Sequence, residues 1–152
     1  MSRKVAIIVS KGGLDEVYPA FILANGARQS GIEASLFFTF YGLDAIMETK
    51  VDRLHVNMAG NASSPIPTVV AGLPGMERVA ATMMQRQMQE LELPGAREFL
   101  EILHDSGARI YGCQLAMEMF KVDRDSLIPQ VEDVITVGDF FEICDGAQVL
   151  FT

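Results

Sequence analysis

Short apolar runs that alternate with segments of helical spacing restrict the fold of this chain more than any other feature of the sequence. Residues 4–9, KVAIIV, are apolar after the first position and stop at SKGG, whereas residues 14–30 carry apolar side chains three or four positions apart. A strand without polar alternation is typical of a parallel sheet that helices cover on both faces. The pattern therefore predicts an α/β fold with right-handed crossovers between parallel strands.

The alternation continues to the end of the chain. Further strands are expected at residues 33–40, 107–112, 134–137 and 147–152, and further helical segments at residues 41–48, 76–91, 96–104, 114–120 and 139–144. Pro19 removes a backbone hydrogen bond beyond the first turn, so the first helix is expected to begin near Val17. Residues 51–75 show no sustained period, which is typical of a functional loop, an oligomer contact or a mobile segment.

Length and composition favour a single domain, residues 1–152, that assembles with copies of itself. The chain is 49% hydrophobic, which suggests that apolar surface is buried between subunits, and we expect a homo-oligomer. A net charge of -8 opposes binding to nucleic acid or to anionic membranes. The apolar run at the N-terminus is too short for a signal sequence or a membrane span, so a cytoplasmic location is expected.

The two cysteines are expected to be free thiols in a reducing compartment, and they differ in position. Cys113 follows the expected strand at residues 107–112 and precedes a helix, where the helix dipole and unpaired N–H groups favour a thiolate. A small apolar residue that packs in the core is an equally good interpretation of Cys113 from the residues alone. Cys144 lies at the end of a short helix and is interpreted as a packing residue.

Other candidate sites are weaker. The turn SKGGLDE, residues 10–16, is able to hold an anion at a helix N-terminus, but it matches neither a dinucleotide-binding nor a phosphate-loop motif. His55 and His104 lack metal-ligand spacing. The methionines on residues 76–88 and 117–119 are interpreted as core or interface residues rather than as Cu(I) ligands. We therefore predict no cofactor and no metal.

Three stretches of the sequence carry a resemblance to a known family. They are SKGGLDEVYPAFILANGARQSGIEASLFFTFYGL, LPGMERVAATMMQRQM and GARIYGCQLAMEMF, and together they span most of residues 4–122. The chain resembles the DsrE/DsrF/DsrH-like family, and within it the DsrE-type sulfurtransferases of the branch that is labelled peroxiredoxin. The resemblance implies a three-layer α/β/α domain, a mainly parallel sheet of about five strands, and homo-oligomers.

The resemblance also implies a function and a set of site residues. Cys113 takes the place of the family's sulfur-carrying cysteine, while Gly12 and Asp15 match the N-terminal turn. Gly13 and Gln114 are added as residues expected to line the site. The leading hypothesis is a sulfur carrier or sulfurtransferase that holds a persulfide on Cys113 and exchanges sulfur with donor and acceptor proteins.

Two other functions are weighed against the sulfur carrier. One is a non-catalytic module of the same fold that binds a small anion or serves assembly. The other is a thiol peroxidase, which is disfavoured because GARIYGCQ lacks the threonine and proline of a peroxidatic site. Sulfur transfer further predicts that the sulfur of Cys113 is open to solvent at the junction between strand and helix.

Overall fold

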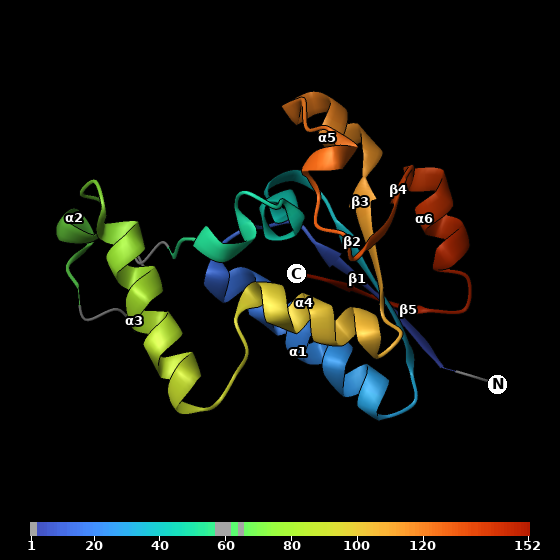
Figure 1. Ribbon diagram of the computed structural model, residues 1–152, viewed down its shortest axis with the longest axis horizontal. Coiled ribbons are helices and arrows are strands. Elements are labelled where there is room, and N and C mark those ends of the chain that lie inside the picture. Colours follow the sequence, from blue (N-terminus) through green and yellow to red (C-terminus); the bar gives the residue numbers. More distant parts are fainter. Residues whose placement is uncertain (1–2, 57–61, 64–65) are drawn as a thin grey trace.

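Five parallel strands form one sheet in the order β4-β3-β2-β1-β5 (Figure 1). The computed structural model describes residues 3–56, 62–63 and 66–152. The strands are β1 (Lys4–Val9), β2 (Glu33–Phe38), β3 (Arg109–Cys113), β4 (Val131–Ile135) and β5 (Gln148–Phe151). All four neighbouring pairs are parallel, so the predicted α/β class and parallel sheet are confirmed.

Helices cover both faces of the sheet. On one face α1 (Leu14–Gln29) and α4 (Ala96–Asp105) pack against each other through aromatic rings, with the centroids of Phe21 and Phe99 5.4 Å apart. On the other face Phe140 of α6 (Val137–Ile143) stacks on Phe37 of β2 at 4.6 Å. Both faces therefore bury large side chains, each contributing about 1.5–3 kcal/mol of transfer free energy.

The edge at which the strands end carries short helical elements. They are η1 (Phe40–Ile46), η2 (Val51–Arg53) and α5 (Gln114–Phe120), followed by η3 (Arg124–Ser126). A Cβ atom at Gly42 would overlap the carbonyl oxygen of Val9, and one at Gly12 would overlap the carbonyl oxygen of Tyr41. Glycine at both positions allows η1 to lie directly on the ends of the strands.

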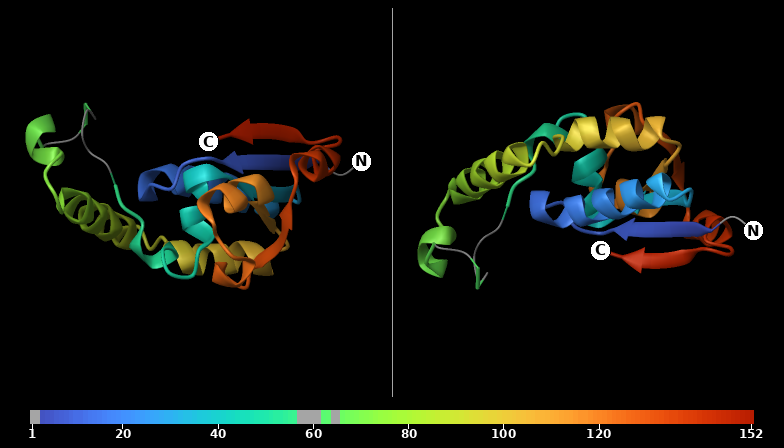
Figure 2. Two further views of the ribbon diagram at one scale, coloured as in Figure 1. Left: turned by 90° about the horizontal axis from the view of Figure 1, so that it is seen from above. Right: turned by 90° about the horizontal axis from the view of Figure 1, so that it is seen from below.

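Two helices, α2 (Thr68–Ala71) and α3 (Met76–Glu90), form an arm that extends away from the sheet. Both views of Figure 2 show these helices projecting from the rest of the molecule. The expectation of an irregular stretch at residues 51–75 is therefore only partly correct, since η2 and α2 are helical. Residues 57–61 and 64–65 of that stretch lie outside the described residues.

Several boundaries differ from those expected. The first helix begins at Leu14 rather than near Val17, because Glu16 caps it and Pro19 lies on its exposed side. The strand expected at residues 134–137 is Val131–Ile135, an edge strand with a register shift whose exposed Glu132 and Asp133 conceal the pattern. None of the helices in the described part of the chain combines the length and the apolar character needed to cross a membrane.

Candidate functional site around Cys113

Cys113 is the last residue of β3 and directly precedes α5. It pairs with Ile135 at the end of β4, and its extended backbone, with φ -79° and ψ 118°, makes it the N-cap residue of α5. The expected place at the junction between strand and helix is therefore confirmed. The helix has only seven residues, so its N-terminus does not by itself make a binding site.

The thiol of Cys113 is buried in the single chain. Its relative exposure is 4%, and it belongs to the hydrophobic core. The expectation of a sulfur open to solvent is thus wrong for the isolated chain, because β3 extends through Cys113 instead of stopping at Gly112. Alternation along the strand places Cys113 on the same face as Tyr111, which pairs with Phe37 beneath α6.

The element that follows Cys113 is the short helix α5. Ala116 and Met117 are the buried residues of this helix, while Leu115 and Met119 are exposed. The helix ends at Lys121, whose φ of 55° lies in the left-handed region. Two buried side chains anchor α5, whereas α4 buries four.

Gln114 lies next to Cys113 but does not point toward the core. Its Nε2 atom donates to Oε1 of Glu118 at 3.1 Å, and the residue is exposed. The side chain therefore runs along the surface of α5, one turn from the cysteine.

The backbone N–H groups of the N-terminal turn donate hydrogen bonds to acceptors of the same chain. The N–H group of Gly13 donates to Oε1 of Glu16 at 3.2 Å, and the N–H group of Leu14 donates to the carbonyl oxygen of His55 at 2.9 Å. The anion expected at this helix N-terminus is thus the carboxylate of Glu16 itself. Asp15 is exposed beside the turn.

The structure places the glycine turn and Cys113 at the same edge of the sheet but in different surroundings. Gly12 and Gly13 line a cavity of about 780 Å³ that Cys113 does not reach. The turn follows β1 and the cysteine ends β3, with β2 between them, a separation of about 10 Å between the two strands. Between the turn and the cysteine, η1 lies over the edge at which the strands end.

Sequence reasoning missed an aromatic cluster that connects η1 to α5. The ring of Phe120 stacks on Tyr41 at 5.4 Å between centroids and meets Phe40 edge-on at 6.1 Å. All three rings are exposed, Tyr41 most of all at 66%. The run FTFYG is the sequence signal for this cluster. The sequence predicts a strand through Phe40, whereas Phe40 begins η1 with a left-handed φ of 50°.

Cys144 lies far from Cys113. It caps the C-terminus of α6, which returns antiparallel to the strands, and therefore sits near the edge at which the strands begin. The residue is half-buried against the core, and this burial raises the pKa of its thiol. The interpretation of Cys144 as a packing residue agrees with this position, and the two free thiols lie at opposite ends of the sheet.

Comparisons with known proteins cover almost the whole chain. The model of the DsrE/DsrF/DrsH-like family matches residues 1–151. Sulfur carrier protein DsrE2 of Allochromatium vinosum is 33% identical over 155 residues, which cover 97% of this chain and 96% of that protein. Uncharacterized protein YrkE of Bacillus subtilis is 19% identical over 158 residues, covering 99% and 97% of the two chains.

Two solved structures share the fold at low sequence identity. Protein MTH1491 from Methanobacterium thermoautotrophicum, described as of unknown function, superposes with a TM-score of 0.61 at 11% identity, covering 99% of this chain and all of that one. The ychN protein from E. coli gives a TM-score of 0.60 at 15% identity, with 99% of both chains covered. At these identities the two structures show a shared fold and nothing more.

Proposed function

Because this chain belongs to the DsrE/DsrF/DrsH-like family, we propose that it is a sulfur carrier that holds a persulfide on Cys113. The observation that carries the proposal is the position of a free cysteine at the strand-to-helix junction, in a chain similar along its length to a sulfur carrier protein. Small parallel-sheet domains place reactive groups at this edge.

The transfer consists of two thiol exchange steps that need no external oxidant. The thiolate of Cys113 attacks the terminal sulfur of a donor persulfide, a new S–S bond forms, and the donor leaves as a thiolate that takes up a proton. An acceptor thiolate then attacks the outer sulfur of the Cys113 persulfide. The outer sulfur leaves with the acceptor, and Cys113 returns as a thiolate.

Burial of Cys113 requires a step that exposes it. We infer that α5 moves away from the end of β3, either transiently or when a partner binds, since this short helix contributes only Ala116 and Met117 to the core. The carrier then keeps its persulfide away from water and from other thiols between encounters. This protection suits a carrier better than an enzyme that turns over a small substrate.

Donor and acceptor proteins need a surface next to Cys113 on which to dock. The rings of Phe40, Tyr41 and Phe120 form an exposed aromatic cluster on η1 and α5, and α5 also exposes Leu115 and Met119. Aromatic side chains of this kind are enriched in protein interfaces. We propose that partner proteins bind to this surface. We also propose that the chain is located in the cytoplasm, where free thiols persist.

Transfer itself tests the proposal. The chain is loaded with polysulfide, desalted, and mixed with a small acceptor thiol such as reduced glutathione, and persulfide is measured on both. We expect sulfur to leave the wild-type chain and the Cys144→Ala variant at similar rates, and the Cys113→Ala variant to carry none. Loading that is the same in Cys113→Ala as in the wild type would refute the proposal.

One observation favours a second function, a non-catalytic module for assembly. Cys113 is 4% exposed in the single chain, as a packing residue would be. Under this alternative both thiols stay inert toward iodoacetamide in the folded chain at every pH short of unfolding. Alkylation of Cys113 in the native state, faster than global unfolding allows, distinguishes the carrier from the module.

A further inference from the structure

The cavity beside the N-terminal turn gathers positive charge in an acidic protein. It has a volume of about 780 Å³ and lies between the turn, η1, η2 and the start of α3. Four basic side chains line it, Lys11, Lys50, Arg53 and Arg78, together with His55. The whole chain has 12 Lys and Arg residues against 20 Asp and Glu, so this concentration is not a consequence of composition.

Two of the ammonium groups and the imidazole of His55 have a carboxylate nearby. Lys50 Nζ lies 3.2 Å from Asp44, His55 Nδ1 lies 3.4 Å from Glu77, and Lys11 Nζ lies 4.0 Å from Glu16. These three acids also belong to the lining. The lining therefore holds four Lys and Arg side chains against three Asp and Glu, and none of these three acids pairs with a guanidinium group of the lining.

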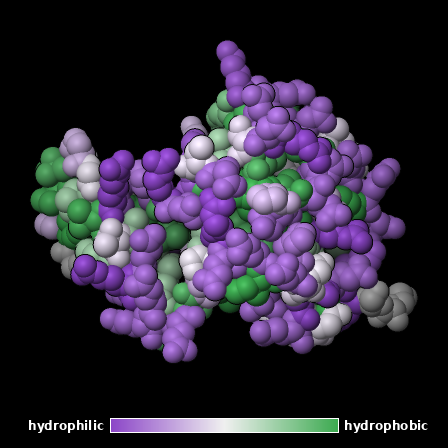
Figure 3. Space-filling view, viewed as in Figure 1, coloured by the Kyte–Doolittle hydropathy of each residue, from purple (hydrophilic) through white to green (hydrophobic). Residues whose placement is uncertain are grey.

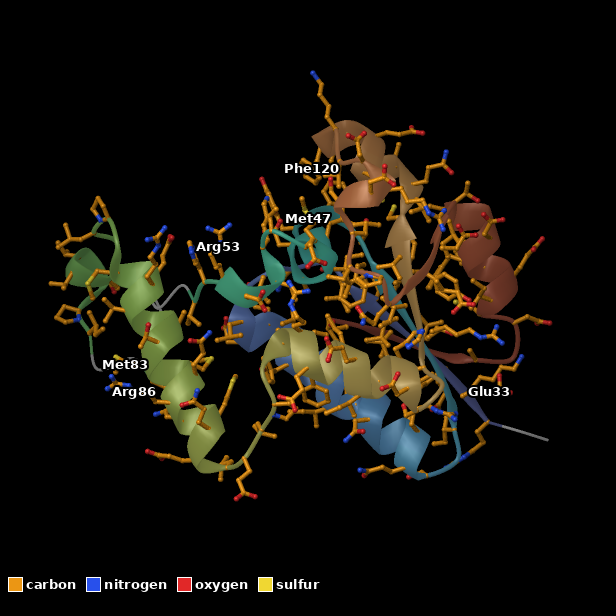
Figure 4. The ribbon with its side chains drawn as sticks, viewed as in Figure 1. Glu33, Met47, Arg53, Met83, Arg86 and Phe120 are labelled. Carbon is orange, nitrogen blue, oxygen red and sulfur yellow. The ribbon has the colours of Figure 1, made fainter. Side chains whose placement is uncertain are left out.

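Arg53 and Arg78 have no carboxylate partner within the described part of the chain. Arg53 donates through Nε and Nη2 to the carbonyl oxygen of Thr49, at 3.2 and 2.6 Å. That acceptor is neutral, so it orients the guanidinium and leaves its charge uncompensated. Figure 4 shows Arg53 in the space between η2 and α3, the helix that carries Arg78.

We propose that this cavity binds a small molecule bearing a tetrahedral oxyanion, such as a phosphate, sulfate or sulfonate group, through Arg53 and Arg78. A guanidinium presents two parallel donors that match two oxygens of such a group. The N–H groups of Gly13 and Leu14 are already used within the chain, so the side chains supply the recognition. A cavity larger than one inorganic ion leaves room for the rest of the molecule.

The proposal goes beyond sulfur carriage, because Cys113 does not line the cavity. Its concave form and the net charge of -8 favour a small ligand over nucleic acid, whose binding needs an extended basic surface. Figure 3 shows hydrophilic residues on the face between the arm and the rest of the molecule. The charged side chains in the lining of the cavity suit a charged ligand.

Isothermal titration calorimetry with inorganic phosphate and with inorganic sulfate, each against sodium chloride at equal ionic strength, tests the site. We expect saturable binding at one site per chain, weakened about tenfold in Arg53→Gln and in Arg78→Gln, as loss of a charge-assisted pair does. Arg86→Gln is the matched control: it lies on α3 but outside the lining, and Figure 4 shows it on the side of α3 away from Arg53.

The possible outcomes test oxyanion binding at this cavity separately from sulfur transfer at Cys113. Unchanged binding in the Arg53→Gln, Arg78→Gln double variant, equal weakening in Arg86→Gln, or no heat beyond that of chloride each overturns it. A stronger response to sulfate than to phosphate assigns the site to sulfur oxyanions, and the reverse assigns it to phosphates. Cys113→Ala is expected to bind as the wild type does, so failure of sulfur transfer and failure of this site are distinguishable.

Discussion

Gly42 has no side chain, and this allows η1 to pack against the ends of the strands. Its backbone lies against Val9, so that a Cβ atom would overlap the carbonyl oxygen of that residue. The same carbonyl accepts the N–H group of Thr39 at 3.0 Å. A side chain at position 42 therefore displaces η1 from the end of β1.

We predict that Gly42→Ala lowers the free energy of unfolding by about 1–3 kcal/mol, the usual cost of overpacking. Gly26→Ala is the matched control, because Gly26 lies within α1 and a Cβ atom there meets nothing within 4 Å. Alanine favours the helix, so this control is expected to gain about 0.5–1 kcal/mol. Urea unfolding of both variants measures the difference, and equal stabilities would contradict the packing of η1.

The partly buried thiol of Cys144 is expected to make the stability of the folded chain depend on pH. Burial raises the pKa of its thiol above the ordinary value of 9.0, so the folded chain holds this proton more tightly than the unfolded chain does. The stabilisation is full below pH 9.0 and is lost as the pH rises through the higher pKa of the folded state. We expect the unfolding midpoint to fall over that alkaline range in the wild type and to fall less in Cys144→Ala. The same alkaline decline in both would contradict the assignment.

Among the elements, the proposed exposure of the Cys113 sulfur concerns α5. Met117 is 5% exposed and anchors the helix, whereas Met119, two residues further on, is 51% exposed. Truncation of a buried methionine costs about 2–5 kcal/mol, while truncation of an exposed one stays within about 0.5 kcal/mol. The two positions therefore separate anchoring of α5 from changes to its surface.

We predict that Met117→Ala speeds iodoacetamide alkylation of Cys113 and that Met119→Ala leaves the rate unchanged. Leu100→Ala on α4, fully buried and remote from α5, corrects for general loss of stability. At matched unfolding free energies, Met117→Ala must still react faster than Leu100→Ala. If the two react at the same rate, exposure of Cys113 takes place by global unfolding and not by motion of α5.

An element is predicted well from the sequence when the residues of that element alone show which of its side chains are buried. β1 and the helix Gln114–Phe120 lie as expected, because an unbroken apolar run or a regular helical period marks each of them. β4 begins three residues before the expected strand at residues 134–137, since an edge strand with exposed Glu132 and Asp133 lacks such a run. The depth of Cys113 was missed for another reason: it follows from pairing with Ile135, which is distant in sequence.

At the scale of the whole molecule, the arm is the part that the single chain supports least. Ala80 and Ala81 are the buried residues of α3, while Val79 and Met83 are exposed, at 47% and 40%. Figure 3 shows apolar surface gathered toward the far end of the arm. A helix of 15 residues with so little packing is marginal in water, which supports the proposal of a homo-oligomer assembled through this arm.

We predict that Met83→Glu weakens assembly by at least about tenfold, because it places a charge in an apolar contact. Gln87→Glu adds the same charge at an exposed polar position of α3 and is expected to leave assembly intact. Light scattering coupled to size-exclusion chromatography gives the mass of each variant. A wild-type chain that elutes as a single subunit at micromolar concentration would contradict a homo-oligomer of this kind.

The most direct test of the central claim is peptide mass spectrometry of the native protein after polysulfide treatment and alkylation. We predict that the peptide containing Cys113 gains sulfur, in the wild type and in Cys144→Ala alike, although its thiol is almost fully buried in the resting chain. Added sulfur found on the Cys144 peptide alone, or on neither peptide while the protein stays folded, would contradict it.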